Sequence, residues 1–129
     1  MASEMAEKFM NALLEIEDTG HAESMAEIFS DDAEVSNLAT IEPMRGRDGA
    51  QRFWMDYLNV FDHIRSQFTR VIENGGQIVL EWNSHGALRD GSRIDYRGVS
   101  VLETDGGRVR RFHAYYDTAM FLKPHHGGD

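Results

Sequence analysis

The chain of 129 residues contains no cysteine. That absence excludes disulfide bonds, thiol nucleophiles and thiolate ligands for a metal ion. No apolar run approaches the ~20 residues that a membrane-spanning helix needs, and the first residues are acidic, unlike the basic start of a signal peptide. We therefore expect a cytoplasmic protein with no membrane partner.

A basic surface is missing as well. The chain has 13 Lys and Arg against 22 Asp and Glu, a formal net charge of -9, and its Arg residues are not gathered into one helix or tail. Nucleic acid and anionic lipid repel a protein of this charge. Neither is an expected partner.

The composition fits one globular domain. Hydrophobic residues make up 41% and charged residues 27%, which is ordinary for a soluble domain, and the length allows one core but not two. No repeat, linker or low-complexity block interrupts the chain. We assign residues 1–122 to a single domain and residues 123–129, which are polar and Gly-ended, to a flexible tail.

Strand-like segments dominate the last third of the chain. Residues 77–86, 92–102 and 108–117 each have a strand pattern, and they are joined by Asp90-Gly91 and Asp105-Gly106-Gly107. Glycine reaches positive φ without steric cost, so these turns are strong hairpin signals. With residues 64–72 before them, the segments predict a four-stranded antiparallel meander.

Helical patterns precede the meander. Apolar residues recur at intervals of three and four from Met5 to Ile16, which predicts an amphipathic helix that ends near Thr19-Gly20. Residues 25–29 predict a short second helix, residues 33–38 a short strand, and Asp48 the N-cap of a third helix. This order predicts an α+β domain with its pocket between the sheet and the helices.

Four short motifs then point to a known superfamily. They are Phe29-Ser-Asp-Asp-Ala-Glu-Val, Arg45-Gly-Arg-Asp-Gly, Gly107-Arg-Val and Tyr115-Tyr-Asp. In this order, over nearly the whole chain, they resemble the nuclear transport factor 2-like superfamily, which includes ketosteroid isomerases, limonene epoxide hydrolases and SnoaL-like polyketide cyclases. The resemblance implies a conical α+β barrel: three N-terminal helices packed on a curved antiparallel sheet around a mostly apolar pocket. It also implies a homodimer through the outer sheet face.

Side chains alternate between the two faces of a strand, so one marker residue assigns its neighbours. Trp82 marks the concave face, and the family register adds Phe112, Ala114 and Tyr116 in the last strand. In the middle strand the expected inward set is Asp95, Arg97, Val99 and Val101. The expected pocket lining combines aromatic, small and apolar residues: Trp54, Tyr57, Leu80, Trp82, Ser84, Val99, Phe112 and Ala114. A slip of one residue would reverse every assignment in a strand.

The reactions known in the superfamily are not supported by the residues at the matching positions. A limonene epoxide hydrolase needs an Arg and two Asp where this chain has Trp82, Ser84 and Ala114. A ketosteroid isomerase needs an Asp base and two oxyanion donors where this chain has Asn37, Leu13 and Val99. An amide does not accept a proton at neutral pH, and Leu and Val donate no hydrogen bond.

The remaining catalytic candidates are Asp95, Arg97, Tyr116 and Asn37. Asp95 and Arg97 are two residues apart on the middle strand, so they share a face and form a buried pair if that face points inward. Asp95 would then act as general base, with Arg97 and Tyr116 as electrophilic donors. Their alternative interpretation is a solvated ion pair at the mouth of the cone. Asn37 either orients a substrate or bonds the backbone at a strand end.

His85 and His113 lie on the outer face in this register, in a structural or dimer-interface role. A slipped register would bring both into the pocket and favour a His-based dehydratase or cyclase. No metal site is expected, since no His-Glu-x-x-His spacing occurs and His125-His126 lie in the tail. No cofactor is expected either.

Three functional hypotheses follow from the sequence. The first is a cofactor-free acid–base enzyme, of isomerase, cyclase, dehydratase or hydrolase type, acting on a small apolar molecule. The second is a binding protein with the same pocket and no chemistry. The third is a dimeric scaffold whose cone is filled by its own aromatic residues, chiefly Trp54, Trp82, Phe112 and Tyr116.

Overall fold

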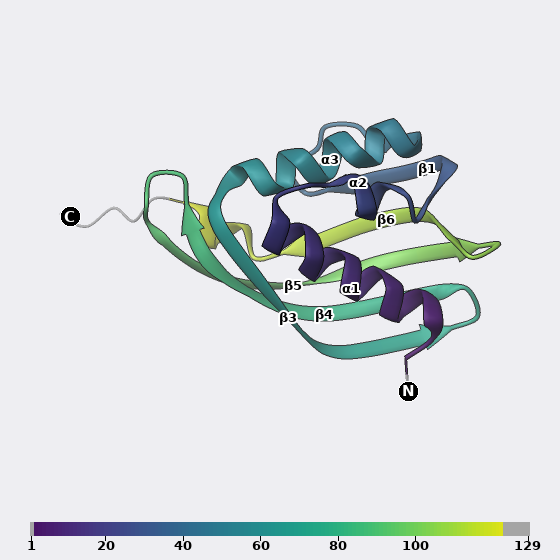
Figure 1. Cartoon of the computed structure of the whole chain (residues 1–129). Coiled ribbons are helices and arrows are strands. Elements are labelled where there is room, and N and C mark those ends of the chain that lie inside the picture. Colours follow the sequence, from purple (N-terminus) through teal and green to yellow (C-terminus); the bar gives the residue numbers. More distant parts are fainter. Residues whose placement is uncertain (1, 123–129) are drawn as a thin grey trace.

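Helices and one strongly curved sheet make up the computed structural model of the chain, which describes residues 2–122 (Figure 1). The elements, in chain order, are α1 (Glu4–Thr19), α2 (Glu23–Ala26), β1 (Phe29–Asn37), β2 (Met44–Arg45), α3 (Gly46–Val60), β3 (Phe61–Asn74), β4 (Gln77–Leu88), β5 (Arg93–Asp105), β6 (Arg108–Tyr116) and the short 3-10 helix η1 (Thr118–Phe121). The expected α+β order of the chain is confirmed. The expected tail, residues 123–129, lies outside the described residues.

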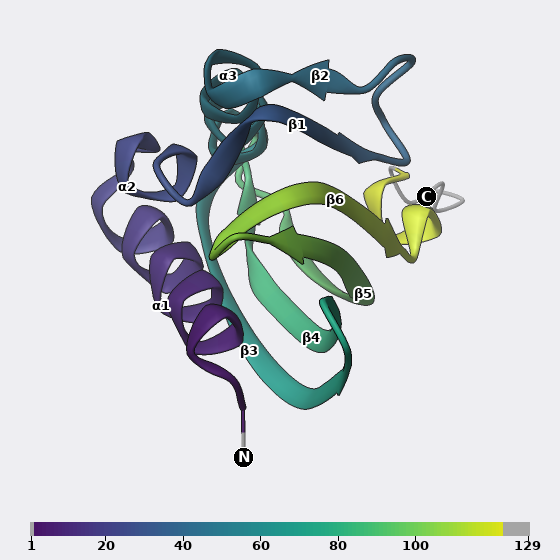
Figure 2. The ribbon, with the colours of Figure 1, turned by 90° about the vertical axis from the view of Figure 1, so that its right-hand side faces the viewer.

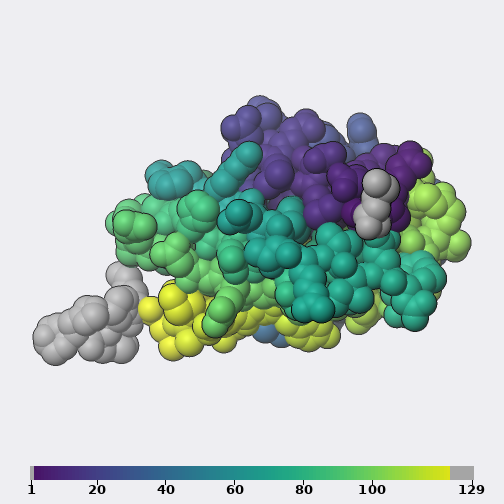
Figure 3. All heavy atoms as spheres, turned by 90° about the horizontal axis from the view of Figure 1, so that it is seen from below, coloured from purple at the N-terminus to yellow at the C-terminus, as the bar shows by residue number. Residues whose placement is uncertain are grey.

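Helix α1 begins and ends where its sequence predicts. Ser3 caps the N-terminus by accepting a hydrogen bond from the Ala6 N–H at 3.2 Å. Gly20 ends the helix at φ 79°, a left-handed conformation that glycine adopts without steric cost. The buried face includes Phe9, Leu13 and Ile16, and it lies along β3, as Figure 3 shows for the purple and teal side chains.

Two boundaries differ from the sequence prediction. Phe29, expected in the second helix, begins β1 instead, because it pairs with Val109 of β6 and this tertiary contact outweighs the local helical pattern. Helix α3 begins at Gly46 rather than after Asp48. Asp48 lies in its first turn, where a negative charge is favourable near the helix N-terminus.

The sheet is mixed rather than purely antiparallel. Its strand order is β2-β1-β6-β5-β4-β3, and β1 runs parallel to β6 while the other neighbours are antiparallel. The meander therefore forms as expected, and β1 and β2 extend it on one side. Figure 2 shows the resulting curl, with α1 and α3 on the concave side.

Glycine at the bend lets the strands approach closely. A Cβ on Gly86 of β4 would collide with the His63 carbonyl of β3, and a Cβ on Gly98 of β5 would collide with the Tyr115 carbonyl of β6. Only a residue without a side chain fits at such close backbone approaches. These two glycines, together with β-bulges in three strand pairs, permit the strong curvature that makes a cone.

The register of β5 differs from the prediction by one residue. A two-residue turn at Asp90-Gly91 would pair Arg89 with Ser92 and would place Arg97 opposite Ser84. Instead the hairpin closes with Ala87 opposite Arg93, and Tyr96 lies opposite Ser84. One residue of turn length exchanges the two faces of the whole strand. The concave face of β5 consequently presents Ile94, Tyr96, Gly98, Ser100 and Leu102.

The core lies between the helices and the concave face. Phe9 of α1, Trp54 of α3 and Phe112 of β6 meet there, with ring centroids 5.5 Å apart for Phe9 and Phe112 and 5.1 Å apart for Trp54 and Phe112. Leu80 is fully buried in this core. Within residues 2–122, none of the helices combines the length and the apolar composition that a bilayer span requires.

Candidate functional site

A cavity of about 470 Å³ lies between the concave face, α1 and α3. Ten of its 23 lining residues are aromatic: Phe9, Phe53, Trp54, Tyr57, Phe61, Trp82, Tyr96, Phe112, Tyr116 and Phe121. Leu38 and Val60, which are 47% and 44% exposed, also line it, so the cavity opens to solvent near the β1–β2 connection and the end of α3. The cone is therefore not filled by its own aromatic residues, contrary to the scaffold hypothesis.

Many of the expected lining residues do face this cavity. They come from β1, α3, β4 and β6: Asn37, Trp54, Tyr57, Trp82, Ser84, Phe112, Ala114 and Tyr116. The strand alternation in β4 and β6 was thus assigned correctly. Leu80 points inward as expected but belongs to the packed core and does not line the cavity.

The prediction that Asp95, Arg97 and Val99 point into the cone is wrong. Asp95 pairs with His85 and Arg97 with Asn83, and these four residues are exposed on the outer face. Val99 lies opposite Glu81 on the same face. The physical reason is the β4–β5 turn, whose extra residue reverses the two faces of β5.

The two histidines lie on the outer face, as the sequence predicts. His85 is exposed, and His113 is half-buried with its Nδ1 2.6 Å from the Ser36 hydroxyl of β1. Burial, together with the neighbouring Arg111 charge, lowers the pKa of His113. Neither imidazole is available to chemistry in the cavity.

A hydrogen-bonded network forms one wall of the cavity and includes residues that sequence reasoning missed. Glu17 Oε2 accepts from the Tyr57 hydroxyl at 2.6 Å and from the Ser66 hydroxyl at 2.6 Å, while Glu17 Oε1 accepts from the Ser66 N–H at 2.8 Å. The Ser66 and Ser84 hydroxyl oxygens are 2.6 Å apart. Tyr96 lies opposite Ser84 on the same face. Five side chains from α1, α3, β3, β4 and β5 thus meet at one polar point of an otherwise apolar wall.

Burial dominates the electrostatics of this network. Removal from water raises the pKa of Glu17, although its bonds to Ser66 and Tyr57 and the charge of Arg65 oppose the shift. Burial also raises the pKa of Tyr57 well above its ordinary value, and that of Tyr96 likewise. Both phenols consequently keep their protons at neutral pH and act as neutral hydroxyl groups.

Further polar groups lie elsewhere in the lining. Trp82 donates from its indole Nε1 to the Ser100 hydroxyl at 2.9 Å. The Asn37 side-chain oxygen accepts from the Ala39 and Thr40 N–H groups at 2.8 and 3.1 Å, so the expected strand-end role is realised at a residue that also lines the cavity. Asp117 accepts from the Ala119 N–H at 3.1 Å and caps η1.

Two sequence signals could have revealed the missed network. Glu17 follows Leu13 by four residues, so it continues the apolar stripe of α1 onto the face that packs against β3. A carboxylate in that position requires buried donors. The second signal lies in β5, where the apolar residues Ile94 and Leu102 share a face with Tyr96 and could have marked that face as inward. A five-residue connection between Ala87 and Arg93 is the turn length that gives this register.

The network does not form a metal site. Across residues 2–122, no group of three or more His, Asp, Glu or Cys side chains is arranged to hold a metal ion. Glu17 instead satisfies its carboxylate oxygens with neutral donors.

Comparison with known proteins identifies the family. A family model described as a SnoaL-like domain matches residues 7–112. No curated protein sequence matches the chain.

Solved structures share the fold. A protein from Catenulispora acidiphila with a ketosteroid isomerase-like fold, in complex with trimethylamine, has a TM-score of 0.81 at 15% identity, with 95% of this chain and 92% of that chain covered. A putative SnoaL-like polyketide cyclase from Jannaschia sp. CCS1 has a TM-score of 0.74 at 16% identity, with 96% and 99% covered. TerC, co-crystallised with polyporic acid, has a TM-score of 0.71 at 17% identity, with 88% and 95% covered. At these identities the likeness concerns the fold, not the reaction.

Proposed function

The chain belongs to the SnoaL-like domain family, whose fold is the nuclear transport factor 2-like cone, and we propose that it binds a small, largely apolar molecule in the cone. The observation that supports this proposal is the open cavity of about 470 Å³ with its aromatic lining. Cavities of this size and character are suited to small organic ligands. Burial of the ligand's apolar surface would provide most of the binding free energy.

The polar groups of the lining would orient the ligand. Tyr57 and Tyr96 lie at the wall beside Ser66 and Ser84, and Tyr116 lies against Tyr96 with ring centroids 5.8 Å apart. Burial raises the pKa of Tyr116, so its hydroxyl stays protonated and can donate a hydrogen bond. We propose Tyr116 as a donor and Asn37 as an orienting amide.

Two structural relatives support a small organic ligand, since one is in complex with trimethylamine and another was co-crystallised with polyporic acid. These two ligands differ in charge and in size. The family resemblance therefore supports the ligand's location rather than its identity.

Filling the cavity tests the proposal. Ala114 is buried in the cavity lining, so Ala114→Phe should remove the space that the ligand occupies. The control is Gln67→Phe, which adds the same ring to the exposed outer face of β3. Binding of small apolar fluorophores, followed by titration, should be lost in the first variant and retained in the second. Equal binding by both variants would place the ligand outside the cone.

A catalytic form of this function is favoured by the hydrogen bond between Tyr57 and Glu17. The Tyr57 oxygen could accept an acidic proton from the ligand while its own proton moves to Glu17, which becomes a neutral carboxylic acid. The ligand anion that remains would need a hydrogen bond from the Tyr116 hydroxyl, because the described lining holds no cation. This is cofactor-free acid–base chemistry of the isomerase, cyclase or dehydratase type. Turnover of activated ketones that depends on Glu17 and is absent in Glu17→Gln would support it; turnover unchanged in that variant would contradict it.

We also propose a homodimer through the outer sheet face. Half-buried valines continue across the strands there, with Val79 opposite Val101 and Val99 opposite Tyr115, which is 46% exposed. Acidic and basic side chains flank these valines, whereas the chain as a whole has a net charge of -9. A second copy of the chain could therefore pair its opposite charges with this face.

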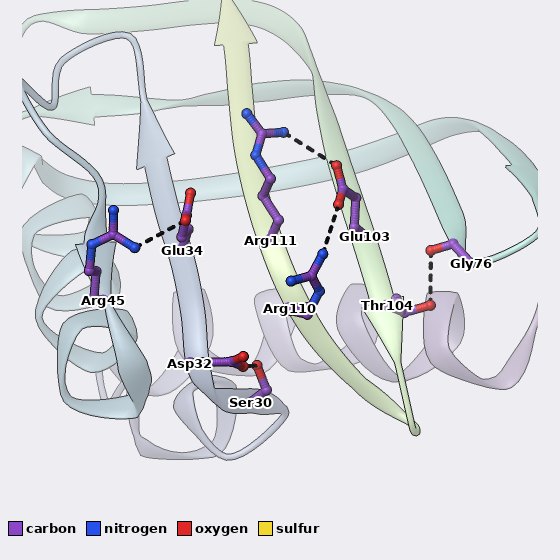
Figure 4. Close-up of polar contacts among 9 residues, drawn as sticks. All are labelled: Ser30, Asp32, Glu34, Arg45, Gly76, Glu103, Thr104, Arg110 and Arg111. Carbon is purple, nitrogen blue, oxygen red and sulfur yellow. Dashed lines mark hydrogen bonds and ion pairs between the residues drawn. The ribbon is translucent and has the colours of Figure 1, made fainter.

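Figure 4 shows part of that flanking charge: Glu34 bonds Arg45 at 3.0 Å, and Glu103 contacts both Arg110 and Arg111 at 3.8 Å. Light scattering at micromolar concentration should give twice the monomer mass, and Val101→Arg should reduce it to the monomer mass. Thr69→Arg, on exposed β3, is the matched control. A monomeric wild type would refute the dimer.

A further inference from the structure

Within residues 2–122, the cavity lining contains no cationic side chain. None of the described lining residues is Lys, Arg or His, and the one charged residue among them is Asp56, which is exposed. An anionic ligand would find no counter-charge in such a site, and burying it would be costly. The lining thus disfavours carboxylates and phosphates, whatever their apolar part.

The network behind the wall has the geometry of an ionised carboxylate. Glu17 accepts three hydrogen bonds, from the Tyr57 hydroxyl and from the hydroxyl and backbone N–H of Ser66. Because the single Tyr57 proton is directed at Glu17, the Tyr57 oxygen can only accept a hydrogen bond from the cavity side. At Tyr57 the wall therefore offers negative charge and an acceptor oxygen to the cavity.

The protein supplies little positive charge to balance Glu17. The groups that face it are Tyr57 from α3, Arg65 and Ser66 from β3, and Tyr96 from β5. Arg65 is exposed and already donates to the Leu14 carbonyl at 3.1 Å. Within residues 2–122, this half-buried negative charge has no buried counter-ion, and the cavity lies on the other side of Tyr57 and Ser66.

Aromatic rings enclose the same end of the cavity. Trp54 and Tyr57 meet edge to face with centroids 5.5 Å apart, and Trp82 and Tyr96 do so at 5.3 Å. Rings that meet at such steep angles form corners, and the π faces of a corner attract a cation with apolar substituents.

From these observations we propose that the cavity selects an organic ammonium ion, a tertiary or quaternary amine with apolar substituents, held by the aromatic corners and the Glu17 charge. The inference rests on the proposed function, because it names the ligand class of the same cavity. A tertiary ammonium would in addition donate its N–H to the Tyr57 oxygen. Glu17 acts through Tyr57 and Ser66 and is a positioning residue, since it does not line the cavity itself.

The test compares two probes of the same shape, benzyltrimethylammonium and its neutral isostere neopentylbenzene. Quenching of Trp54 and Trp82 fluorescence reports binding, since both indoles line the cavity. We expect the wild type to prefer the cation, and Glu17→Gln to lower that preference about tenfold or more. Glu15→Gln removes the same charge from an exposed position on α1 and should leave the preference unchanged.

Salt and pH sharpen the test. The preference should largely persist in about 0.5 M NaCl, because salt screens the exposed negative charges of the chain much more than the half-buried carboxylate of Glu17. The charge of the quaternary probe is fixed, so its affinity should fall as the pH is lowered and Glu17 becomes protonated, while neopentylbenzene binds equally throughout. This measurement needs no variant and decides the matter even if Glu17→Gln does not fold.

The outcomes separate the two proposals. Neopentylbenzene binding as tightly as the cation, or a cation preference that survives in folded Glu17→Gln, would overturn the ammonium inference and leave the proposed function standing. Failure of both probes to bind the wild type would overturn the proposed function and the inference with it.

Discussion

The two faces of the β4–β5–β6 meander are built from alternate residues of the same strands, yet they differ in every physical respect. The concave face presents Trp82, Tyr96 and Phe112, which are at most 8% exposed. The Trp82 indole donates to Ser100, and Tyr96 lies opposite Ser84. The outer face presents valines flanked by solvated ion pairs such as Glu103 with Arg111. Which face of the strand a residue lies on therefore says more about its role than its position along the chain does.

The difference also separates strong from weak interactions. A hydrogen bond within the cone is shielded from water, whereas an ion pair on the outer face competes with solvent and with salt. Substitutions of equal size should therefore have unequal effects on the two faces.

The largest effect is expected at Gly98, where the backbone of β5 closely approaches β6. A Cβ there would collide with the Tyr115 carbonyl. Because backbone cannot move aside as a flexible side chain does, Gly98→Ala should lower the free energy of unfolding by about 3 kcal/mol. Arg97→Ala, on the outer side of the same strand, should change it by less than about 0.5 kcal/mol. Urea denaturation measures both, and equal effects would contradict the comparison.

A smaller effect is expected from removing one polar group on each face. Trp82→Phe deletes the donor to Ser100, which is 4% exposed, and leaves a gap in the packed wall. The expected loss is about 2 kcal/mol. Tyr115→Phe on the outer face deletes a hydroxyl from a residue that is 46% exposed, and should cost less than about 0.5 kcal/mol. Thermal unfolding of the two variants should therefore differ by several degrees; coincident transitions would show that the two faces are energetically alike.

The pH dependence of stability provides a third contrast. Burial raises the pKa of Glu17 above its ordinary value of 4.5, so the folded chain binds the proton more tightly than the unfolded chain does. Stability of the wild type relative to Glu17→Gln should then fall as the pH rises from 4.5 through the raised pKa. Denaturation at several pH values measures the slope. If the wild type instead becomes more stable relative to Glu17→Gln as the pH rises, hydrogen bonding to the carboxylate outweighs its desolvation.

The smallest effect is expected from the outer charge pairs. Glu103 contacts Arg110 and Arg111 at 3.8 Å, and all three side chains are at least one-third exposed. Glu103→Gln should reduce stability by less than about 1 kcal/mol, and high salt should remove the difference. A larger, salt-independent loss would indicate that this face is buried, as the proposed dimer requires.

Much of the fold could be predicted from local sequence. The apolar spacing of α1, its Gly20 end and the glycine turns of the meander all specify short-range conformation, and these elements formed where expected. The parallel pairing of β1 with β6 could not be predicted in this way, because it joins residues 77 to 80 positions apart.

The residues that β4 and β6 contribute to the candidate site could be predicted from local sequence, whereas those of β5 and α1 could not. Trp82 and Phe112 are bulky and apolar, so their strands disclose the buried face. Asp95 and Arg97 were assigned to the wrong face because the length of the β4–β5 turn decides which residues of β5 point inward. The Asp90-Gly91 signal predicts a turn but does not fix its length to within one residue. Glu17 was missed because its partner Ser66 is 49 residues away, and its meaning lies in that contact.

Helix α1 is tethered to the edge strand β3 along its whole length (Figure 3). The Ser3 N–H donates to Glu73 at 2.8 Å near one end, Arg65 donates to the Leu14 carbonyl at 3.1 Å, and Glu17 latches onto Ser66 near the other end. The contact of Glu17 with Ser66 is also part of the cavity wall. A bound ligand that strengthens or weakens this contact would therefore also strengthen or weaken the packing of α1 on β3. The rate of amide hydrogen exchange in α1 would then report whether a ligand occupies the cone.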